Sequence, residues 1–200
     1  EGRVAWRHAA RAPSMTMMSD APIGVVILAH RDDRLAALLG KRGLATVQLD
    51  LESDASVEQV ASRLVAAIDA VVSDPAHRGL PIGLFVAGRC AAAAVIAGAQ
   101  RIDLISAVVG AGCDRPELAG VWLQALRTPT LLIVGSQDTA VVRANRAAAR
   151  AMVARHRVAV IPGANHLFEE PGALDEVAAA AGTWFVTHAR AAWAVQKTVA

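Results

Sequence analysis

The sequence is poor in the features that mark membrane proteins and nucleic-acid-binding proteins. No apolar run reaches the roughly 18 to 20 residues needed to cross a bilayer, because a glycine, a proline or a charged residue interrupts each long run. Lys41 and Lys197 are the only lysines, and the arginines are scattered along the chain, so the net charge of +2 forms no concentrated basic stripe. We therefore expect neither a membrane nor a nucleic acid as a partner.

Cysteine is scarce as well. Cys90 and Cys113 lie in different settings, and two cysteines make a poor disulfide framework for a chain of 200 residues. We interpret both as free thiols in a reducing compartment, which predicts a cytoplasmic protein. Internal repeats and low-complexity segments are absent from the sequence too.

Short apolar runs rich in β-branched residues are what the sequence does contain. Each run is too short for a helix and has the composition of a strand that is covered on both faces. Helical patterns lie between them, the clearest being an apolar stripe over residues 57–72, which Ser56 and Gln59 begin with a capping box. This alternation predicts an α/β fold with a doubly wound, mostly parallel sheet in a three-layer sandwich. The expected strands are residues 24–28, 45–49, 82–86, 104–109, 130–134 and 157–161.

The length and the 54% hydrophobic content fit a single domain with a sizeable core, which we place at residues 21–190. Residues 1–20 have no apolar periodicity and carry arginines around Trp6, so we treat them as a flexible N-terminal segment or linker. Residues 191–200 are too short to classify and are treated as a C-terminal tail.

The carboxyl ends of parallel strands are where such folds place their chemistry. Residues Val86 to Cys90, at the end of the third strand, have the shape of a strand-turn-helix catalytic elbow and lead into an alanine-rich helix. Asp138 follows the fifth expected strand, and His166 follows the sixth. The elbow, the acid and the histidine therefore occur in the chain order of the α/β hydrolases.

Three segments carry a more specific resemblance: RLVAAIDAVVSDPAHRGLPIGLF, TPTLLIVGSQDTAVVRANRAA and VIPGANHLFEEPGALDEVAAAAGTWF. From about Ile23 to His188 the chain resembles the small dienelactone-hydrolase-type α/β hydrolases, especially the group found beside or fused to phosphoribosyltransferase domains. The resemblance implies hydrolysis of an ester or a lactone. It also implies a triad in which Asp138 takes the acid position and His166 the base position.

The elbow departs from the pattern of this family, Gly-x-Ser-x-Gly. Laid on without gaps, the motif places its serine at Gly88 and its two glycines at Val86 and Cys90. Gly88 supplies no nucleophilic atom, and the flanking side chains do not favour the strained turn that the motif requires. Residues 30–33 also lead straight into a helix, where the family has a glycine-rich loop that helps to form the oxyanion hole. We therefore predict a catalytically impaired hydrolase, a pseudoenzyme.

Cys90 offers an alternative nucleophile. Residues 88–92 fit a relaxed Gly-x-Cys-x-small pattern if the strand runs two residues longer, and the family resemblance includes dienelactone hydrolases with a cysteine in the elbow. Arg89 and the helix N-terminus would favour the thiolate. In the gapless register, however, Cys90 lies one turn into the helix as a small buried thiol.

Arg89 is also a candidate for binding the carboxylate or phosphate of an anionic ligand. A salt bridge to Asp138 or Glu169 is an equally simple role for the same side chain. His30 and Arg31, which follow the first strand, are further candidate ligand contacts.

Other polar residues near the strand ends have ordinary structural roles available. Four of them could meet around a hard metal ion, but separate roles as helix caps and solvated charges fit them better, so we expect no metal and no cofactor. These four are His30, Asp32, Asp50 and Glu52. Asp138, similarly, could simply cap the helix that follows it.

Three functions therefore remain open. The first is a catalytically silent homologue that binds a small ester, a lactone or an anionic ligand, or a partner such as a fused or associated domain. The second is an active ester or lactone hydrolase with Cys90 as the nucleophile, His166 as the base and Asp138 orienting it. The third is a structural module that forms a homodimer through a sheet edge or through an apolar helix such as Val177 to Phe185.

Overall fold

The computed structural model describes residues 21–29, 32–49, 55–88 and 91–199. Six of the residues singled out above lie outside the described residues, as does segment 1–20: His30, Arg31, Asp50, Glu52, Arg89 and Cys90. The described elements are β1 (Gly24–Leu28), α1 (Asp33–Gly40), β2 (Leu44–Gln48), α2 (Val57–Ser73), η1 (Pro75–His77), β3 (Ile82–Ala87), α3 (Ala91–Gln100), β4 (Ile105–Ala111), η3 (Pro116–Ala119), α4 (Trp122–Ala125), β5 (Thr130–Gly135), α5 (Thr139–Ala151), β6 (His156–Ile161) and α6 (Ala173–Val199).

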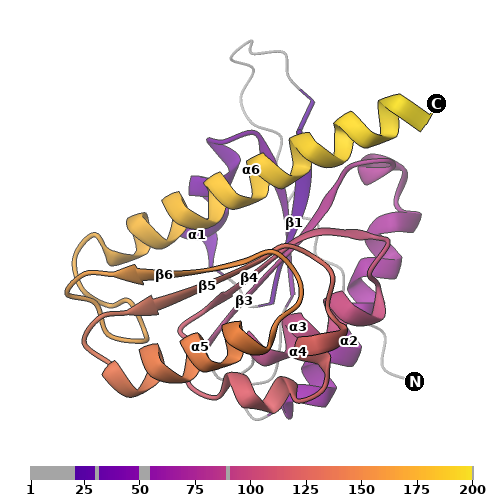
Figure 1. The fold of residues 1–200 in the computed structure, drawn as a ribbon. Helices are drawn as coiled ribbons and strands as arrows, with labels where there is room; N and C mark the ends of the chain where they lie inside the picture. The colour runs from indigo at the N-terminus through magenta and orange to yellow at the C-terminus, as the bar shows by residue number, and fades with distance from the viewer. Residues whose placement is uncertain (1–20, 30–31, 50–54, 89–90, 200) are drawn as a thin grey trace.

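Six strands form one sheet in the order β2-β1-β3-β4-β5-β6, and each neighbouring pair is parallel. Parallel neighbours require crossover connections, so helices cover both faces of the sheet. Figure 1 shows the resulting three layers, with α1 and α6 on one face and α2, α3 and α5 on the other. The predicted α/β, doubly wound architecture is confirmed.

Alternate residues of each strand fill two separate cores. In β1, Val25 and Ile27 belong to the core under α2 and α3, whereas Val26 and Leu28 belong to the core under α1 and α6. Every residue of β1 is buried, which explains why its sequence is a continuous apolar run instead of an alternating one.

Helix α3 is buried on almost all sides because it is built from small residues. All of its residues from Ala91 to Gly98 are buried. A Cβ at Gly98 would lie 3.0 Å from Val108 Cγ2 and 3.2 Å from Leu126 Cδ1, so the glycine lets the helix approach β4 closely. The alanine run after the elbow is therefore a packing requirement of the central helix.

Two helix starts that the sequence predicts, those of α1 and α2, are confirmed. Ser56 and Gln59 form the capping box of α2, in which each side chain accepts a hydrogen bond from the backbone N–H of the other, at 3.2 and 2.8 Å. Asp32 caps α1, because its Oδ1 accepts from the backbone N–H of Leu35 at 2.8 Å. The connection from β1 to α1 is therefore only residues 29–32, as short as expected.

Helix α6 uses its apolar face in the core. Val177, Ala181 and Phe185 are at most 2% exposed because they pack on the sheet. The apolar face from Val177 to Phe185 is therefore covered by the sheet of the same chain. A homodimer, whether through a sheet edge or through the remaining surface of this helix, stays a prediction. The expected tail from residue 191 continues α6 as far as Val199. None of the described helices combines the length and the apolarity that a membrane crossing requires.

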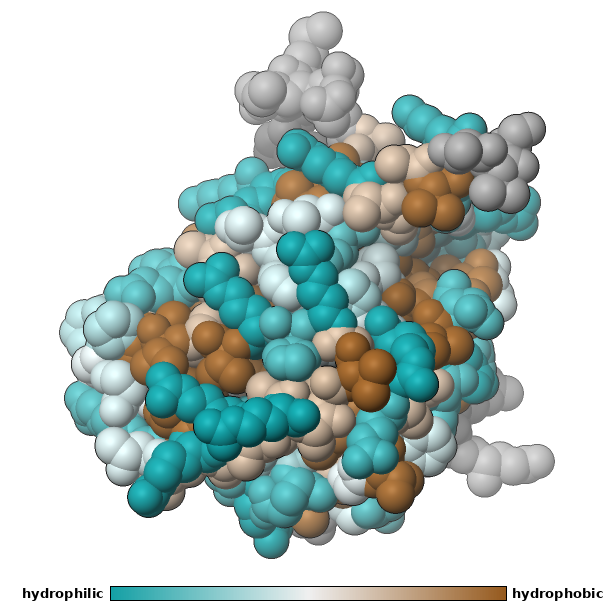
Figure 2. Space-filling model, viewed as in Figure 1, coloured by the Kyte–Doolittle hydropathy of each residue, from teal (hydrophilic) through white to brown (hydrophobic). Residues whose placement is uncertain are grey.

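The solvent side of α5 is basic. Arg143, Arg146 and Arg150 are spaced by three and four residues, which places them along one side of the helix. Figure 2 shows long hydrophilic side chains over this part of the molecule. These three arginines of α5 therefore form a small basic surface, although the arginines as a whole are scattered along the sequence. The expectation that the protein does not bind nucleic acid stays a prediction.

Gly83→Ala tests the packing between the sheet and α6. The new Cβ would lie 2.6 Å from the ring of Phe185, which is buried and has little room to move. We expect the free energy of unfolding to fall by about 1–3 kcal/mol, as in other overpacked cores. In the matched control Gly40→Ala nothing lies within 4 Å of the added Cβ, and we expect no loss of stability. Urea unfolding measures both, and equal stabilities would contradict the contact between Phe185 and Gly83.

Candidate functional site

The candidate site lies at the edge of the sheet where the parallel strands end. Gly88 follows β3, Asp138 follows β5, and His166 lies in the loop after β6. The structure therefore describes three of the residues that the sequence singles out and brings two of them, Asp138 and His166, into direct contact. The other candidates at this edge, Arg89, Cys90 and the pair His30 and Arg31, lie outside the described residues.

Asp138 holds His166 through two hydrogen bonds to one oxygen. Its Oδ2 accepts from the backbone N–H of His166 at 2.6 Å and lies 2.9 Å from the ring nitrogen Nδ1. Asp138 precedes α5, but its side chain makes no capping bond to that helix, so the simple capping role considered above is wrong. A neutral imidazole that donates from Nδ1 leaves Nε2 as the proton acceptor, which is the tautomer that a general base requires.

The loop that carries His166 is tied to the end of β5. Ser136 Oγ accepts from the backbone N–H of Gly163 at 2.7 Å, and Gln137 Nε2 donates to the carbonyl oxygen of Gly163 at 2.6 Å. The backbone N–H of Gln137 donates to the carbonyl oxygen of Ala164 at 3.0 Å. The acid and the histidine are therefore carried by two loops that are joined by three further hydrogen bonds.

Asn165 shapes the turn in which His166 sits. Its Oδ1 accepts from the backbone N–H groups of Leu167 and Phe168, at 2.8 and 2.9 Å, and its own N–H donates to Glu170 Oε1 at 3.0 Å. Phe168 has φ of +58°, the one positive value among the described residues other than glycine. Strained backbone of this kind persists where the surroundings determine it, so the histidine loop has a defined shape.

Two glycines let this loop press against the strand ends. A Cβ at Gly112 would overlap the carbonyl oxygen of His166, and a Cβ at Gly135 would overlap the carbonyl oxygens of Ala164 and Asn165. Any larger residue at either position would push the histidine away from the sheet. The sequence analysis did not identify these two positions as part of the site. The feature of the sequence that could have indicated them is a glycine at the end of a buried strand (Gly135) or directly after one (Gly112).

Gly88 keeps the backbone conformation of a catalytic elbow. Its φ is +66°, a left-handed value that residues with side chains rarely adopt. We expected the side chains of Val86 and Cys90 to disfavour the strained turn. This expectation is corrected for Val86 and Gly88, the described part of the elbow, because a glycine adopts a left-handed φ without strain. Apart from its chain neighbours, no described residue lies within 4 Å of the position that a Cβ at Gly88 would take.

Gly112 joins the histidine loop to the strand next to β3. Strands β3 and β4 pair Ala87 with Ala111, which directly precede Gly88 and Gly112 in the chain. A Cβ at Gly112 would overlap the carbonyl oxygen of His166, so the histidine loop packs on the end of β4.

Two backbone N–H groups are described in the connection after β1. The backbone N–H of Ala29 donates to the carbonyl oxygen of Phe85 at 3.0 Å, and that of Asp32 donates to Gln48 Oε1 at 2.8 Å. Both described N–H groups of this connection are thus already engaged. The impaired oxyanion hole that the sequence predicts stays a prediction, because His30 and Arg31 lie outside the described residues.

Cys113, directly after Gly112, is a buried thiol and not a nucleophile. It is 1% exposed, and burial raises the pKa of its thiol to about 12. Since the thiolate is the reactive form, Cys113 stays inert near neutral pH. Among the described residues there is also no group of three or more His, Cys, Asp or Glu side chains that could hold a metal ion.

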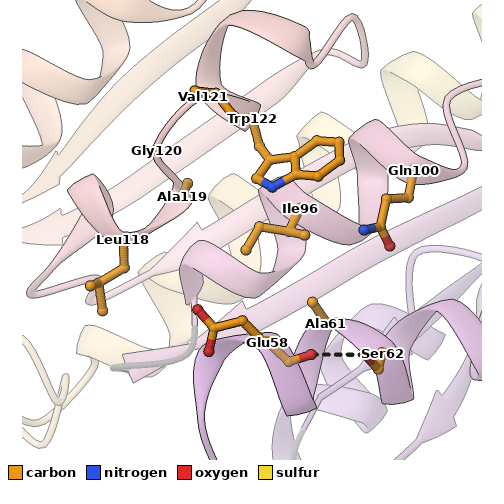
Figure 3. Close-up of a pocket in the computed structure, with 10 residues that line it drawn as sticks. All are labelled: Glu58, Ala61, Ser62, Ile96, Gln100, Leu118, Ala119, Gly120, Val121 and Trp122. Carbon is orange, nitrogen blue, oxygen red and sulfur yellow. Dashed lines mark hydrogen bonds between the residues drawn. The ribbon is translucent and has the colours of Figure 1, made fainter.

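Two cavities in the described part of the chain lie away from this edge. The larger, of about 390 Å³, lies between α2, α3 and the segment from η3 to α4. Figure 3 shows the indole of Trp122 beside Ile96, with Glu58 on the opposite side of the opening. The smaller, of about 290 Å³, lies at the amino ends of β3 and β4 beside the last part of α6. Neither is lined by Asp138 or His166, so neither is the catalytic pocket.

Asp138→Ala removes the acceptor of both His166 bonds. Bonds to a carboxylate are worth about 1.5–3 kcal/mol, and the pair is 42% and 32% exposed, so we expect unfolding free energy to fall by about 1–2 kcal/mol. Nitrogen NMR should also show that His166 no longer prefers the Nδ1–H tautomer. In the control Asp175→Ala an exposed ion pair with Arg34 is lost, and we expect less than about 0.5 kcal/mol. Equal losses in the two variants would contradict the holding role of Asp138.

Cys113 should make the stability fall at alkaline pH. Burial raises its thiol pKa from the ordinary value of 9.0 to about 12, so the unfolded chain loses this proton at lower pH than the folded chain. The stabilising contribution is therefore complete below pH 9.0 and is lost progressively as the pH rises toward about 12. Cys113→Ala should flatten this decline in urea unfolding measured from pH 8 to pH 11. An unchanged decline, or iodoacetamide labelling of Cys113 in the folded protein at pH 8, would show that the thiol is not buried.

Comparison with known proteins identifies relatives of the same kind. The model of the dienelactone hydrolase family matches residues 42–189. The crystal structure of a dienelactone hydrolase from Anabaena variabilis is 36% identical, with a TM-score of 0.78 over 84% of this chain and 87% of that chain. Est1E from Butyrivibrio proteoclasticus, solved with ferulic acid, shares the fold at 16% identity, with a TM-score of 0.70 over 82% of this chain and 89% of its own.

Two curated relatives from Mycobacterium tuberculosis strains carry the name "Putative phosphoribosyl transferase". Each is 37% identical over 187 residues, which cover 84% of this chain and 42% of the relative. The chain therefore spans less than half of the length of these relatives. The resemblance described from the sequence is confirmed by these matches, including its link to proteins named for phosphoribosyl transfer. Because the family model alone matches well over half of the chain, the protein belongs to the dienelactone hydrolase family of α/β hydrolases.

Proposed function

We propose that this protein is a dienelactone-hydrolase-like α/β hydrolase that no longer forms an acyl-enzyme. In this proposal it binds a small ester, a lactone or an anionic ligand at the carboxyl edge of the sheet. The observation that carries the proposal is Gly88, which has the elbow conformation, with φ of +66°, but no side chain that could attack a substrate. The bond between Asp138 and His166 supports a site that keeps its geometry without its nucleophile.

Loss of the nucleophile removes most of the rate of a covalent mechanism. In a serine protease, removal of the serine alone lowers kcat by on the order of 10⁶, about as much as removal of the whole triad. His166 and Asp138 cannot form an acyl-enzyme by themselves, because their part is to take the proton of the attacking group. A missing oxyanion donor weakens such catalysis by about another 2.7–4 kcal/mol, and the N–H groups of Ala29 and Asp32 are engaged elsewhere.

Binding of an anionic ligand suits the residues that surround the elbow. Arg89 follows Gly88 in the chain, and a guanidinium there would bind a carboxylate or a phosphate in a bidentate manner. His30 and Arg31 follow β1, the neighbour of β3, and are proposed as further ligand contacts. The greater length of the curated relatives supports a role beside a fused or associated domain.

Hydrolysis by a cysteine nucleophile is the second candidate function. The observation that favours it is that the described part of α3 begins at Ala91, the residue that follows Cys90 in the sequence, and a helix N-terminus would stabilise a thiolate there. The other cysteine cannot take this role, because Cys113 is buried and its pKa is raised to about 12.

Hydrolysis of p-nitrophenyl acetate, followed before the steady state and by intact-mass spectrometry, tests the proposal. The wild-type protein and Cys90→Ala should both lack a burst of p-nitrophenol and an acetyl adduct. Gly88→Ser should gain both, because the serine would meet no described residue other than its chain neighbours and would have the Asp138–His166 pair as its base. Its turnover should be about 10- to 1,000-fold above that of the wild type. The gain should disappear when His166→Ala is added. A burst in the wild type that Cys90→Ala abolishes would establish the cysteine hydrolase instead.

A further inference from the structure

We propose that the Asp138–His166 pair acts as a general base toward a small external hydroxyl, which attacks a bound acyl group directly. The attacking group is a water molecule or a short alcohol. This inference rests on the proposed function, in which the site lacks a covalent nucleophile, and it adds an activity to that function. The activity is hydrolysis of an acyl compound, or transfer of the acyl group to an alcohol, without an acyl-enzyme.

The place that we propose for the attacking hydroxyl is beside Gly88. Apart from its chain neighbours, no described residue comes within 4 Å of the Cβ position of this glycine. A serine side chain consists of a methylene group and a hydroxyl group, so a place that would hold it also holds a water molecule or the hydroxyl end of a short alcohol. The left-handed φ of Gly88, +66°, is of the kind that the strained turn of a catalytic elbow requires.

The loop of His166 packs on Gly112, at the end of the strand next to β3, and its imidazole presents the nitrogen that the reaction needs. Asp138 Oδ2 bonds both Nδ1 and the backbone N–H of His166, so the ring cannot turn over without losing a bond. Nε2 is therefore on the side of the ring away from the carboxylate, and it has no hydrogen-bond partner among the described residues. With the His166 side chain 42% exposed, a small molecule from solvent can reach Nε2.

The reaction balances with the external hydroxyl as the sole co-reactant. The hydroxyl oxygen bonds to the acyl carbon, its proton passes to Nε2, and the electron pair of the carbonyl double bond moves to the carbonyl oxygen. When this intermediate collapses, the bond to the leaving group breaks and the proton on Nε2 passes to the departing oxygen or sulfur atom. His166 is then neutral again, and Asp138 stabilises the imidazolium between the two proton transfers.

The substrate class follows from the lack of a covalent nucleophile in the proposed function. The N–H groups of Ala29 and Asp32, the ones described in the connection after β1, are engaged with Phe85 and Gln48, so neither of them donates to the tetrahedral intermediate. Leaving groups that depart easily need the least stabilisation. The expected substrates are therefore activated acyl compounds, namely aryl esters and thioesters, and simple alkyl esters and amides should not react.

Steady-state hydrolysis of p-nitrophenyl acetate and phenyl thioacetate by the full chain tests the inference. The wild-type protein and Cys90→Ala should turn over at the same rate, about tenfold or more above His166→Ala, with no acetyl adduct. Gly88→Ala puts a methyl group where the hydroxyl would lie, and its rate should fall to that of His166→Ala. A melting curve shows whether this variant is folded. Added ethanol should yield ethyl acetate in a His166-dependent manner, a readout that needs no change at the elbow.

The contrary outcomes separate this inference from the proposed function. Equal rates for the wild type and His166→Ala, with and without ethanol, would overturn the inference and leave the proposed function intact. A folded Gly88→Ala variant with the wild-type rate would overturn it too, as would an acetyl group on His166, because the imidazole would then be the nucleophile. An acetyl group on Cys90 would overturn the proposed function together with the inference.

Discussion

A single carboxylate oxygen, Oδ2 of Asp138, determines the arrangement of the candidate site. Because it accepts from both the ring and the backbone of His166, the position of the loop and the direction of the imidazole are fixed together. Asp138 itself is fixed because α5 begins at the next residue. The side chain gives up its bond to the helix for this purpose, and a capping bond is worth about 1 kcal/mol. The arrangement therefore favours the histidine over the stability of α5.

Close approach of backbone segments is the second constraint, and it explains why glycines gather at this edge. Gly112 and Gly135 leave room for the carbonyl oxygens of the histidine loop, whereas Gly88 supplies a left-handed conformation. The first two act through the absence of a Cβ and the third through the freedom of its φ angle. Substitutions at these three positions should consequently have different effects, because a Cβ at Gly112 or Gly135 would overlap the histidine loop, whereas a Cβ at Gly88 would strain the backbone.

Much of this architecture could be predicted from the sequence because it depends on local patterns. Continuous apolar runs identify buried parallel strands, and the capping pair at Ser56 identifies the start of α2. The contact of Asp138 with His166 also follows from the sequence, since parallel strands bring their carboxyl ends to one edge. These features need only residue order and periodicity.

Other features depend on how distant segments approach one another, and local patterns do not contain that information. The close approach of the histidine loop to Gly112 and Gly135 is one such feature. The burial of the face of α6 that carries Phe185 is another example, because an apolar stripe predicts burial but not whether the sheet or a second copy covers it. The elbow conformation of Gly88 was missed since its flanking residues differ from the family pattern, although a glycine adopts that conformation without them.

The glycine at the elbow has a consequence for how this chain could evolve. A serine at a φ near +60° holds strain of about 1–3 kcal/mol in its backbone, which active hydrolases tolerate because they need the nucleophile. Gly88 adopts the same conformation with no such strain, so a serine at this position should lower the free energy of unfolding. A mutation from glycine to serine would therefore cost stability before any gain in activity could be selected. For a marginally stable protein this cost favours keeping the glycine.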